Sequence, residues 1–215
     1  MYFSESERAG RAIRSGHFPA KRVFDFVIAL CALALLAPLM VLVMTAIFID
    51  SPGSIFFSQL RFGQNGRLFR IWKFRTMHVA VSDASGGQRT LAWDPRVTRI
   101  GRFLRRTSID ELPQLLNVLL GHMSLVGPRP HTPHMRVEGV HYHEAVPNYH
   151  LRHLVRPGLT GWAQVNGSRG EVDTMAKAHR RVDLDLWYVE NRSAYLDLRI
   201  VLRTAVGGFL SLRAD

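Results

Sequence analysis

The stretch FVIALCALALLAPLMVLVMTAIFI, residues 26–49, contains no charged side chain in a chain of 215 residues that is otherwise rich in arginine. About 20 apolar residues in a helix suffice to cross the hydrocarbon core of a bilayer. A cleavable signal peptide is not indicated, because the stretch is too long, begins late and has no small-residue cleavage site before Asp50. The sequence therefore predicts a membrane helix, which decides the fold class.

Two features bear on how this helix meets the membrane. Pro38 lies at its middle and disfavours helical backbone at Ala37, so a kink or a break is expected there. Both flanks are basic, which places both in the cytoplasm by the positive-inside rule. A re-entrant helix that bends at Ala37-Pro38 and leaves by the same face satisfies both features, whereas a kinked span satisfies only the first. The residues alone leave the two forms open. The basic flanking residues are Arg8, Arg11, Arg14, Lys21 and Arg22 before the stretch, and Arg61, Arg67, Arg70, Lys73 and Arg75 after it.

Asp25 lies just inside the apolar stretch, where an unpaired carboxylate is unfavourable. Arg22, about one helical turn earlier, is its expected partner. The arm before Lys21 is expected to be mobile or to lie on lipid headgroups.

The composition limits the partners. The formal net charge is +11, and arginine supplies almost all of the positive charge because Lys21, Lys73 and Lys177 are the only lysines. Anionic partners are therefore expected, although net charge does not choose among nucleotides, nucleic acid and an acidic bilayer. Nucleic acid is not predicted, since no reader motif or basic aromatic platform is present. The single cysteine, Cys31, excludes a disulfide framework and suits a reducing cytoplasm.

A second stretch, SIDELPQLLNVLLGHMSLVGPRP at 108–130, carries two adjacent acids, Asp110 and Glu111. Pro113 has no N–H and is tolerated only in the first turn of a helix. We therefore expect a helix from about Asp110 to Leu120, ended by Gly121, with both acids at its positive end.

The acids lie between basic residues. Carboxylates beside arginines are suited to phosphoryl chemistry, as a nucleophile or as metal ligands, and the same surroundings favour an ionised Asp110. The alternative is a capping box between Ser108 and Glu111, with Asp110 only complementing the helix dipole. That alternative gives the surrounding arginines no task. These are Arg102, Arg105, Arg106 and Arg129.

The other patterns are local. Residues 54–63 and 67–77 alternate on either side of Gln64-Asn65-Gly66 and predict a β-hairpin. Residues 81–90 predict a mobile loop near the substrate entrance, and residues 174–191 a helix. The tail 196–213 predicts an amphipathic interfacial helix, although a core-facing helix fits almost as well.

Histidines and tryptophans suggest further chemistry. The histidines fit no closed zinc site, and Mg²⁺ prefers oxygen ligands, so at most one or two are expected to touch a substrate. A tryptophan could stack on a base or a sugar, but packing or interfacial anchoring is the more frequent role. The residues are His131, His134, His141, His143, His150 and His153, and Trp72, Trp93, Trp162 and Trp187.

Taken together, the blocks of this chain resemble the bacterial sugar transferases, the monotopic polyprenyl-phosphate phosphoglycosyl transferases. The similarity covers most of the chain and keeps the order of the blocks in that family. The blocks are KRVFDF (21–26), the apolar stretch around Pro38, FFSQLRFGQNG (56–66), KFRTM (73–77), DPRVTRIGRFLRRTSIDELPQLLNVLLGHMSLVGPRP (94–130), RPGLTGWAQVNG (156–167) and DLWYVENRSAYLDLRIVLRT (185–204).

The resemblance implies roles for particular residues. Asp110 matches the nucleophile that attacks the β-phosphorus of a UDP-sugar, releases UMP and forms a covalent aspartyl sugar phosphate. Glu111 matches its partner acid, and both lie beside an essential Mg²⁺. Other positions that match the family are phosphate-binding Arg105, Arg129, Lys73 and Arg75, and Asp185 near the active site. A re-entrant helix is also implied, but the family often has Ser-Pro at the bend where this chain has Ala37-Pro38. The bend angle is therefore less secure.

The fold implied is α/β, mainly helical with a small β-hairpin. We divide the chain into a basic arm (1–20), a re-entrant membrane helix (21–50) and a compact cytoplasmic phosphoglycosyl transferase domain with interfacial amphipathic helices (51–215). The expected location is the cytoplasmic face of the bacterial inner membrane. Branches with extra membrane helices exist, so this chain is either a minimal form or a catalytic fragment.

The expected reaction transfers a sugar 1-phosphate to undecaprenyl phosphate in exopolysaccharide or other glycoconjugate synthesis. VGPRPH (126–131) and the blocks after it look most like the branch that transfers glucose 1-phosphate. The expected partners are a UDP-sugar, undecaprenyl phosphate and membrane lipids, and a homo-oligomer is left open. The alternatives are galactose or an N-acetylated sugar as the group transferred, or a noncatalytic membrane adaptor in a polysaccharide complex.

Overall fold

The structure is a computed structural model, and it describes residues 19–81 and 94–210. Most of the predicted arm, nearly all of the predicted loop at 81–90, and Trp93 lie outside the described residues, as does the end of the tail. The described part is a mixed α/β fold, mostly helical with short strands, which confirms the predicted fold class.

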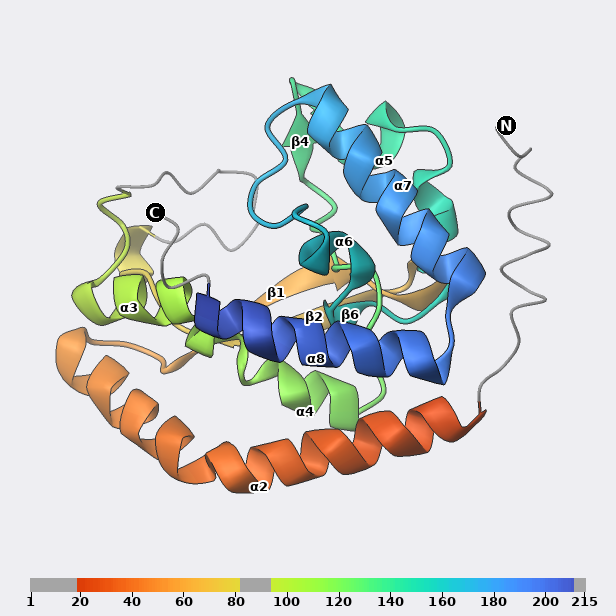
Figure 1. Cartoon of the computed structure of the whole chain (residues 1–215). Coiled ribbons are helices and arrows are strands. Elements are labelled where there is room, and N and C mark those ends of the chain that lie inside the picture. Colours follow the sequence, from red (N-terminus) through yellow and green to blue (C-terminus); the bar gives the residue numbers. More distant parts are fainter. Residues whose placement is uncertain (1–18, 82–93, 211–215) are drawn as a thin grey trace.

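Helix α2 (Pro19–Asp50) contains the whole apolar stretch and continues through Pro38. Of the kink or break predicted at Ala37-Pro38, the structure has the kink, a bend that Figure 1 shows near the middle of α2. Within residues 19–81 and 94–210, α2 is the one helix long and apolar enough to cross a membrane. Ala29 and Ile47 on its inner face are buried, whereas Leu35 is 80% exposed.

The predicted hairpin is confirmed. β1 (Phe56–Phe62) pairs antiparallel with β2 (Leu68–Phe74) around the 3₁₀ turn η1 (Gln64–Gly66). Asn65 and Gly66 have φ angles of 55° and 74°, a left-handed conformation that asparagine and glycine adopt most readily.

The helix predicted at 110–120 is divided differently. α3 (Arg99–Thr107) ends at Ser108, whose φ of 57° turns the chain into the 3₁₀ turn η3 (Ile109–Glu111). α4 (Gln114–Leu119) then begins after Pro113. The predicted start was wrong because the left-handed Ser108 closes a separate 3₁₀ turn before the α-helix. The acids thus lie in a turn, and a helix dipole explains little of their surroundings.

The rest of the chain completes a three-part core. The helix predicted at 174–191 is confirmed as α7, whose first turn is capped by the Thr174 hydroxyl. β3 pairs parallel with β6, and β4 pairs antiparallel with β5. The remaining elements are η2 (Val79–Val81), β3 (Ser124–Val126), β4 (Arg136–Val137), β5 (Val140–His141), α5 (Tyr142–Ala145), η4 (Tyr149–Leu154), β6 (Gly158–Thr160), α6 (Trp162–Val165), α7 (Met175–Asn191) and α8 (Ala194–Leu210).

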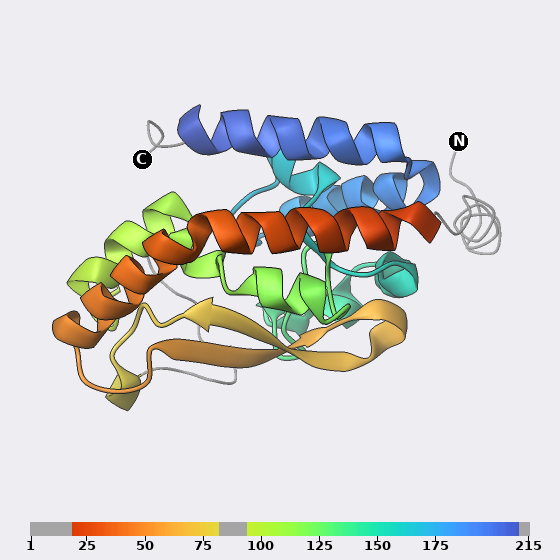
Figure 2. The ribbon, with the colours of Figure 1, turned by 90° about the horizontal axis from the view of Figure 1, so that it is seen from below.

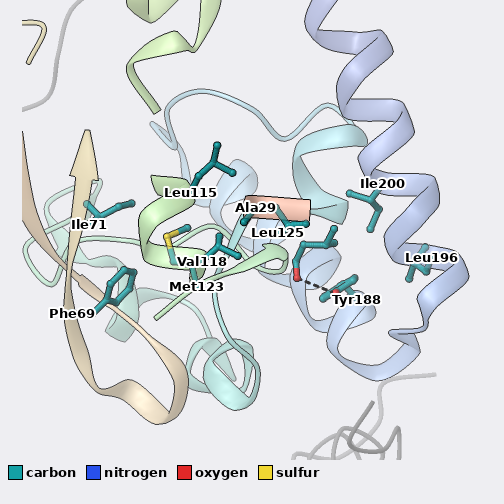
Figure 3. Close-up of a cluster of buried hydrophobic side chains, with 11 residues drawn as sticks. Ala29, Phe69, Ile71, Leu115, Val118, Met123, Leu125, Tyr188, Leu196 and Ile200 are labelled. Atoms are coloured by element: carbon teal, nitrogen blue, oxygen red, sulfur yellow. Dashed lines mark hydrogen bonds between the residues drawn. The ribbon is translucent and has the colours of Figure 1, made fainter. Parts of the chain in front are cut away.

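The largest apolar cluster joins α2 to the other layers. It combines Ala29 of α2, Ile71 of β2, Val118 of α4 and Ile200 of α8. Figure 3 shows these side chains converging from separate elements. In the same cluster the Tyr188 hydroxyl donates to the Val126 carbonyl at 3.1 Å. Figure 2 shows the hairpin as a layer below α2 and α4, with α8 on the other side. α2 is thus a packed part of the fold.

Candidate active site

The acid pair lies next to the apolar helix α2. Ile109 and Leu112, on either side of the acids, pack against a cluster that contains Val43 and Ile47 of α2. The 3₁₀ turn η3 also contacts β2 and α3. The fold therefore brings the acids within one layer of side chains of the apolar stretch.

Glu111 is held by two cations. Lys73 Nζ donates to its Oε1 at 2.7 Å, while Arg129 donates to Oε2 at 3.1 Å and also to Oε1. Burial acts to raise the pKa of Glu111, but Arg129 and Lys73 outweigh it and hold this pKa well below its usual range. Ser108 makes no side-chain cap here, so the capping-box alternative is not what orients Glu111.

Asp110 differs from its neighbour. It is 7% exposed and forms an ion pair with Lys73 at 3.8 Å. No hydrogen bond from a described residue reaches its carboxylate. Burial raises the pKa of Asp110, Lys73 opposes that change, and Glu111 adds to it. The expectation that the surroundings favour an ionised Asp110 is therefore wrong, because the effect of desolvation on its pKa is larger than that of the nearby cations.

Arg129 projects from a tight backbone crossing. Gly127 N donates to Thr160 O at 2.9 Å, and Gly158 N donates to Pro128 O at 3.0 Å. A Cβ at Gly158 would lie 2.1 Å from Gly127 N, so the two backbone segments approach this closely only because residue 158 has no side chain. This crossing fixes the turn from which Arg129 reaches Glu111.

Asp185 is placed behind the site. It is buried and accepts two hydrogen bonds from Arg152, at 3.1 and 2.5 Å, while Arg152 also donates to the Arg129 carbonyl at 2.9 Å. His131 Nδ1 faces Arg152 at 2.6 Å and must accept, since arginine only donates. The predicted proximity of Asp185 to the active site is therefore indirect, through Arg152 and Arg129.

The two remaining predicted cations differ. Arg105 Nε donates to Thr76 Oγ1 at 2.8 Å, and its guanidinium acts electrostatically on Asp110. Arg75 instead donates to the carbonyls of Pro52 at 2.8 Å and Ser51 at 2.6 Å. The geometry argues against its predicted phosphate-binding role, because its terminal nitrogens hold the C-terminal end of α2.

The expected partner of Asp25 was also wrong. Arg22 donates to the carbonyls of Val118 and Leu119, whereas Lys21 forms the ion pair with Asp25 at 3.7 Å. Asp25 also accepts from Ser124 Oγ at 2.7 Å. A carboxylate at the edge of the apolar stretch thus joins α2 to β3.

Three important residues were missed or undervalued by sequence reasoning. Asn117 is fully buried, accepts from Trp72 N at 3.0 Å and donates to Arg70 O at 2.8 Å, which clamps α4 onto β2. Arg152 and Arg61 lie close to Arg129. Only the polarity of Asn117 within an apolar helix could have signalled its role.

One of the histidines and two of the tryptophans make ring contacts inside the fold. His131 stacks on Tyr142, and Trp162 stacks on Trp187 with centroids 4.7 Å apart. A hollow of about 770 Å³ beside this tryptophan pair is lined mainly by α7. In residues 19–81 and 94–210, no three His, Cys, Asp or Glu side chains gather as a metal site.

Comparison with known proteins decides the family. The family model described as bacterial sugar transferase matches residues 16–211. The chain belongs to the bacterial sugar transferase family. This transferase is 52% identical over 186 residues to the exopolysaccharide production protein PSS of Rhizobium leguminosarum bv. phaseoli, covering 86% of this chain and 93% of that protein.

Two longer relatives have descriptive names. The transferase is 53% identical over 184 residues to the undecaprenyl-phosphate glucose phosphotransferase of Komagataeibacter xylinus, covering 86% of this chain and 35% of that protein. It is 46% identical over 194 residues to the UDP-glucose:undecaprenyl-phosphate glucose-1-phosphate transferase of Escherichia coli (strain K12), covering 90% of this chain and 41% of that protein. This chain therefore spans well under half of these two relatives.

Proposed function

We propose that this transferase moves glucose 1-phosphate from UDP-glucose to undecaprenyl phosphate, through a covalent intermediate on Asp110. The observation that carries the proposal is the unequal environment of the two acids. Glu111 is occupied by Lys73 and Arg129, whereas the Asp110 carboxylate accepts no hydrogen bond from a described residue. A nucleophile needs an available lone pair, so Asp110 suits attack and Glu111 suits positioning.

The reaction has two balanced steps. In the first, an Asp110 oxygen forms a bond to the β-phosphorus while the bond from that phosphorus to the bridging oxygen breaks, and UMP leaves with the bonding electrons. In the second, a phosphate oxygen of the lipid attacks the same phosphorus and the Asp110 carboxylate is released. The product is the sugar diphospholipid. Two separate visits suit a soluble donor and a lipid acceptor.

The cations have separate tasks in this scheme. Lys73 and Arg129 fix Glu111, and their remaining donors can neutralise phosphoryl oxygens. Arg105 acts electrostatically on Asp110 from α3. Burial excludes water, which protects a reactive acyl phosphate from hydrolysis.

The donor set fits Mg²⁺. This ion is usually held by one or two carboxylates together with substrate phosphates, and Asp110 with Glu111 supplies such oxygens. When bound, the ion would neutralise charge that develops on the transferring phosphoryl group.

We also propose that α2 is re-entrant and that the body lies on the cytoplasmic face of the inner membrane. Lys21 bonds Asp197 near one end of α2, and Arg75 bonds Ser51 at the other. Both ends thus attach to the same body, whereas the ends of a span are separated by about 30 Å of hydrocarbon. In this proposal, residues 51–215 form the catalytic unit.

Other helices supply further apolar surface. α8 exposes four apolar or aromatic side chains spaced three or four residues apart, as on one helical face. Figure 1 shows α8 and α4 beside α2, with α5 and β4 at the opposite edge. We propose that this apolar side rests in the membrane interface. The exposed side chains are Tyr195, Leu198, Leu202 and Val206 of α8, Leu116 of α4, Leu120 directly after α4, and Phe103 of α3.

Glucose is proposed from the names of the longer relatives. Both act on undecaprenyl phosphate and carry glucose in their names. Galactose or an N-acetylated sugar remains the alternative donor group, and a panel of UDP-sugars chooses among them.

The test measures UMP release. Purified transferase is incubated with undecaprenyl phosphate, Mg²⁺ and each UDP-sugar, and rapidly quenched samples are analysed by intact mass spectrometry. We expect UMP release with UDP-glucose, an adduct of one hexose phosphate, and loss of both in Asp110→Asn. Asp173→Asn, an exposed matched change, should retain both. Wild-type protein that releases no UMP with any donor would favour the adaptor, and an unchanged rate in Asp110→Asn would remove that residue as nucleophile.

A further inference from the structure

Arg61, near the end of β1, lies beside the turn that carries Arg129. Phe62 N donates to His131 O at 3.0 Å, which pins the end of β1 to this turn. Arg61 donates to the Pro130 carbonyl at 3.4 Å and to Gln59 Oε1 at 2.5 Å. The hairpin therefore delivers a second guanidinium next to Arg129, from a distant part of the sequence.

The partners of Arg61 are neutral. Both hydrogen-bond acceptors are amide oxygens, and its buried Nε has no hydrogen-bond partner. Glu111, the nearby carboxylate that acts on Arg61 electrostatically, is bonded by Lys73 and Arg129 instead. Burial lowers the pKa of Arg61 to about 10, and the neighbouring Arg129 adds to this effect.

The surroundings of the acid pair therefore carry an excess of positive charge. Two acidic groups face four cations, which leaves two positive charges in excess with Asp110 ionised and three with Asp110 protonated. The cations are Lys73, Arg105, Arg129 and Arg61. Close arginines that are only partly neutralised are stabilised by an anion between them, and a planar guanidinium binds phosphate oxygens through two parallel hydrogen bonds. The diphosphate of a nucleotide sugar carries two negative charges.

We propose that Arg61 and Arg129 together form a second phosphate subsite beside the acid pair, distinct from the phosphoryl group that Asp110 attacks. The inference rests on the proposed function and deepens it. The ligand is a phosphate monoester or diester, and two sources share that chemistry. One is the phosphate that leaves with the nucleotide, and the other is the phosphate of the lipid acceptor.

The first experiment measures binding without turnover. The thermal unfolding of purified wild-type protein is followed at increasing UMP concentrations and separately at increasing concentrations of a short-chain polyprenyl phosphate. Arg61→Gln should weaken the affinity for one of these ligands about ten- to hundredfold, as expected for loss of a charge-assisted hydrogen bond. Arg61→Lys should recover part of that affinity because it keeps the charge. Arg67→Gln, an exposed arginine on the same hairpin, should bind as wild type does.

The second experiment assigns the source. A UMP burst is measured without acceptor, and the isolated adduct is then mixed with lipid phosphate. A slower burst in Arg61→Gln identifies the nucleotide phosphate, and a slower discharge identifies the lipid phosphate. Arg61→Gln that keeps the wild-type unfolding temperature, both affinities and both rates overturns the subsite. The subsite is also overturned if Arg61→Gln lowers the unfolding temperature but no affinity falls that Arg61→Lys restores. Arg61 would then only hold the Pro130 carbonyl.

This test can fail independently of the proposed function. If Asp110→Asn abolishes the adduct while Arg61→Gln behaves as wild type, the reaction stands and only the subsite is wrong. If wild-type protein forms no adduct, the reaction is wrong, and the binding titration still reports whether Arg61 contacts phosphate.

Discussion

Two neighbouring carboxylates in this transferase have unlike environments because one of them takes the available hydrogen-bond donors. Glu111 receives charge-assisted bonds from two cations, and Asp110, one residue earlier, is left with an ion pair at 3.8 Å. Such bonds are stronger than those between neutral groups and fix geometry. The difference between the environments of the two acids therefore follows from which one the cations reach.

Lys73 serves both acids, so its removal should impair the first step. We expect Lys73→Met to slow the UMP burst about ten- to hundredfold, because a charge-assisted hydrogen bond is lost and the acid pair loses a cation. Rapid-quench measurement of UMP without acceptor gives this rate. Lys177→Met removes an exposed lysine paired with Asp173 and should leave it unchanged. A Lys73→Met burst within twofold of wild type would contradict the assigned role.

Stability should fall in mild acid because of buried histidines. Burial, with Arg152, His150 and His143 nearby, lowers the pKa of His153 from 6.5 to about 3, and burial lowers that of His131 as well. Between the folded and unfolded pKa values the unfolded state binds more protons. The free energy of unfolding should therefore be highest above pH 6.5 and decrease as the pH falls from about 6.5 toward 3.

Chemical denaturation in detergent at a series of pH values measures this slope. His153→Gln should flatten it, since glutamine does not titrate. His179 lines the surface hollow beside α7, and His179→Gln should leave the slope as in wild type. A profile for His153→Gln that is parallel to wild type across this range would show that His153 is not a source of the acid sensitivity.

At the scale of elements, α4 is the helix that joins the site to α2. Its apolar residues enter the same cluster as α2, and Asn117 bonds the backbone of β2 on the other side. α4 has only six residues, too short for a helix to be stable by itself, so tertiary contacts must hold it. Its orientation, and that of the acid turn before it, depends on the Asn117 clamp.

Asn117→Ala should therefore destabilise the fold. It removes the hydrogen-bond partner of the Trp72 N–H and of the Arg70 carbonyl, at a cost of roughly 2–4 kcal/mol. Unfolding in detergent, followed by tryptophan fluorescence, measures this change. Asn191→Ala, at an exposed asparagine at the end of α7, should change stability by less than about 0.5 kcal/mol. Equal effects of the two substitutions would show that the clamp does not stabilise α4.

At the scale of the whole molecule, the proposed topology has both ends of α2 in the cytoplasm. Single cysteines are placed at the exposed positions Ala20 and Ser54 in a Cys31→Ala background. Both cysteines should react with a membrane-impermeant maleimide in inverted vesicles. Neither should react when the reagent is added outside intact spheroplasts. Leu35→Cys, in the exposed apolar middle of α2, should react poorly from both sides. Opposite accessibility of residues 20 and 54 would establish a span and exclude the re-entrant helix.

Local patterns carried much of the fold. The apolar stretch of α2, the hairpin around Asn65-Gly66 and the helix capped by Thr174 were predicted because each depends on neighbouring residues. The kink at Pro38 was predicted as one of two outcomes, whereas the 3₁₀ turn at the acids was not predicted. Both depend on what the segment packs against, since a proline or a left-handed serine permits several backbone paths.

By itself, the sequence determined which groups this protein has available for chemistry: an apolar helix, an adjacent acid pair and an excess of arginine. The tertiary structure alone decided which of them meet. Lys73 reaches Glu111 across 38 residues and Lys21 reaches Asp197 across 176, while Arg75 and Asp185 turn away to structural partners. Hydrogen bonds and ion pairs act over a few ångströms, so the partner of a charged side chain is fixed by how the chain folds back on itself.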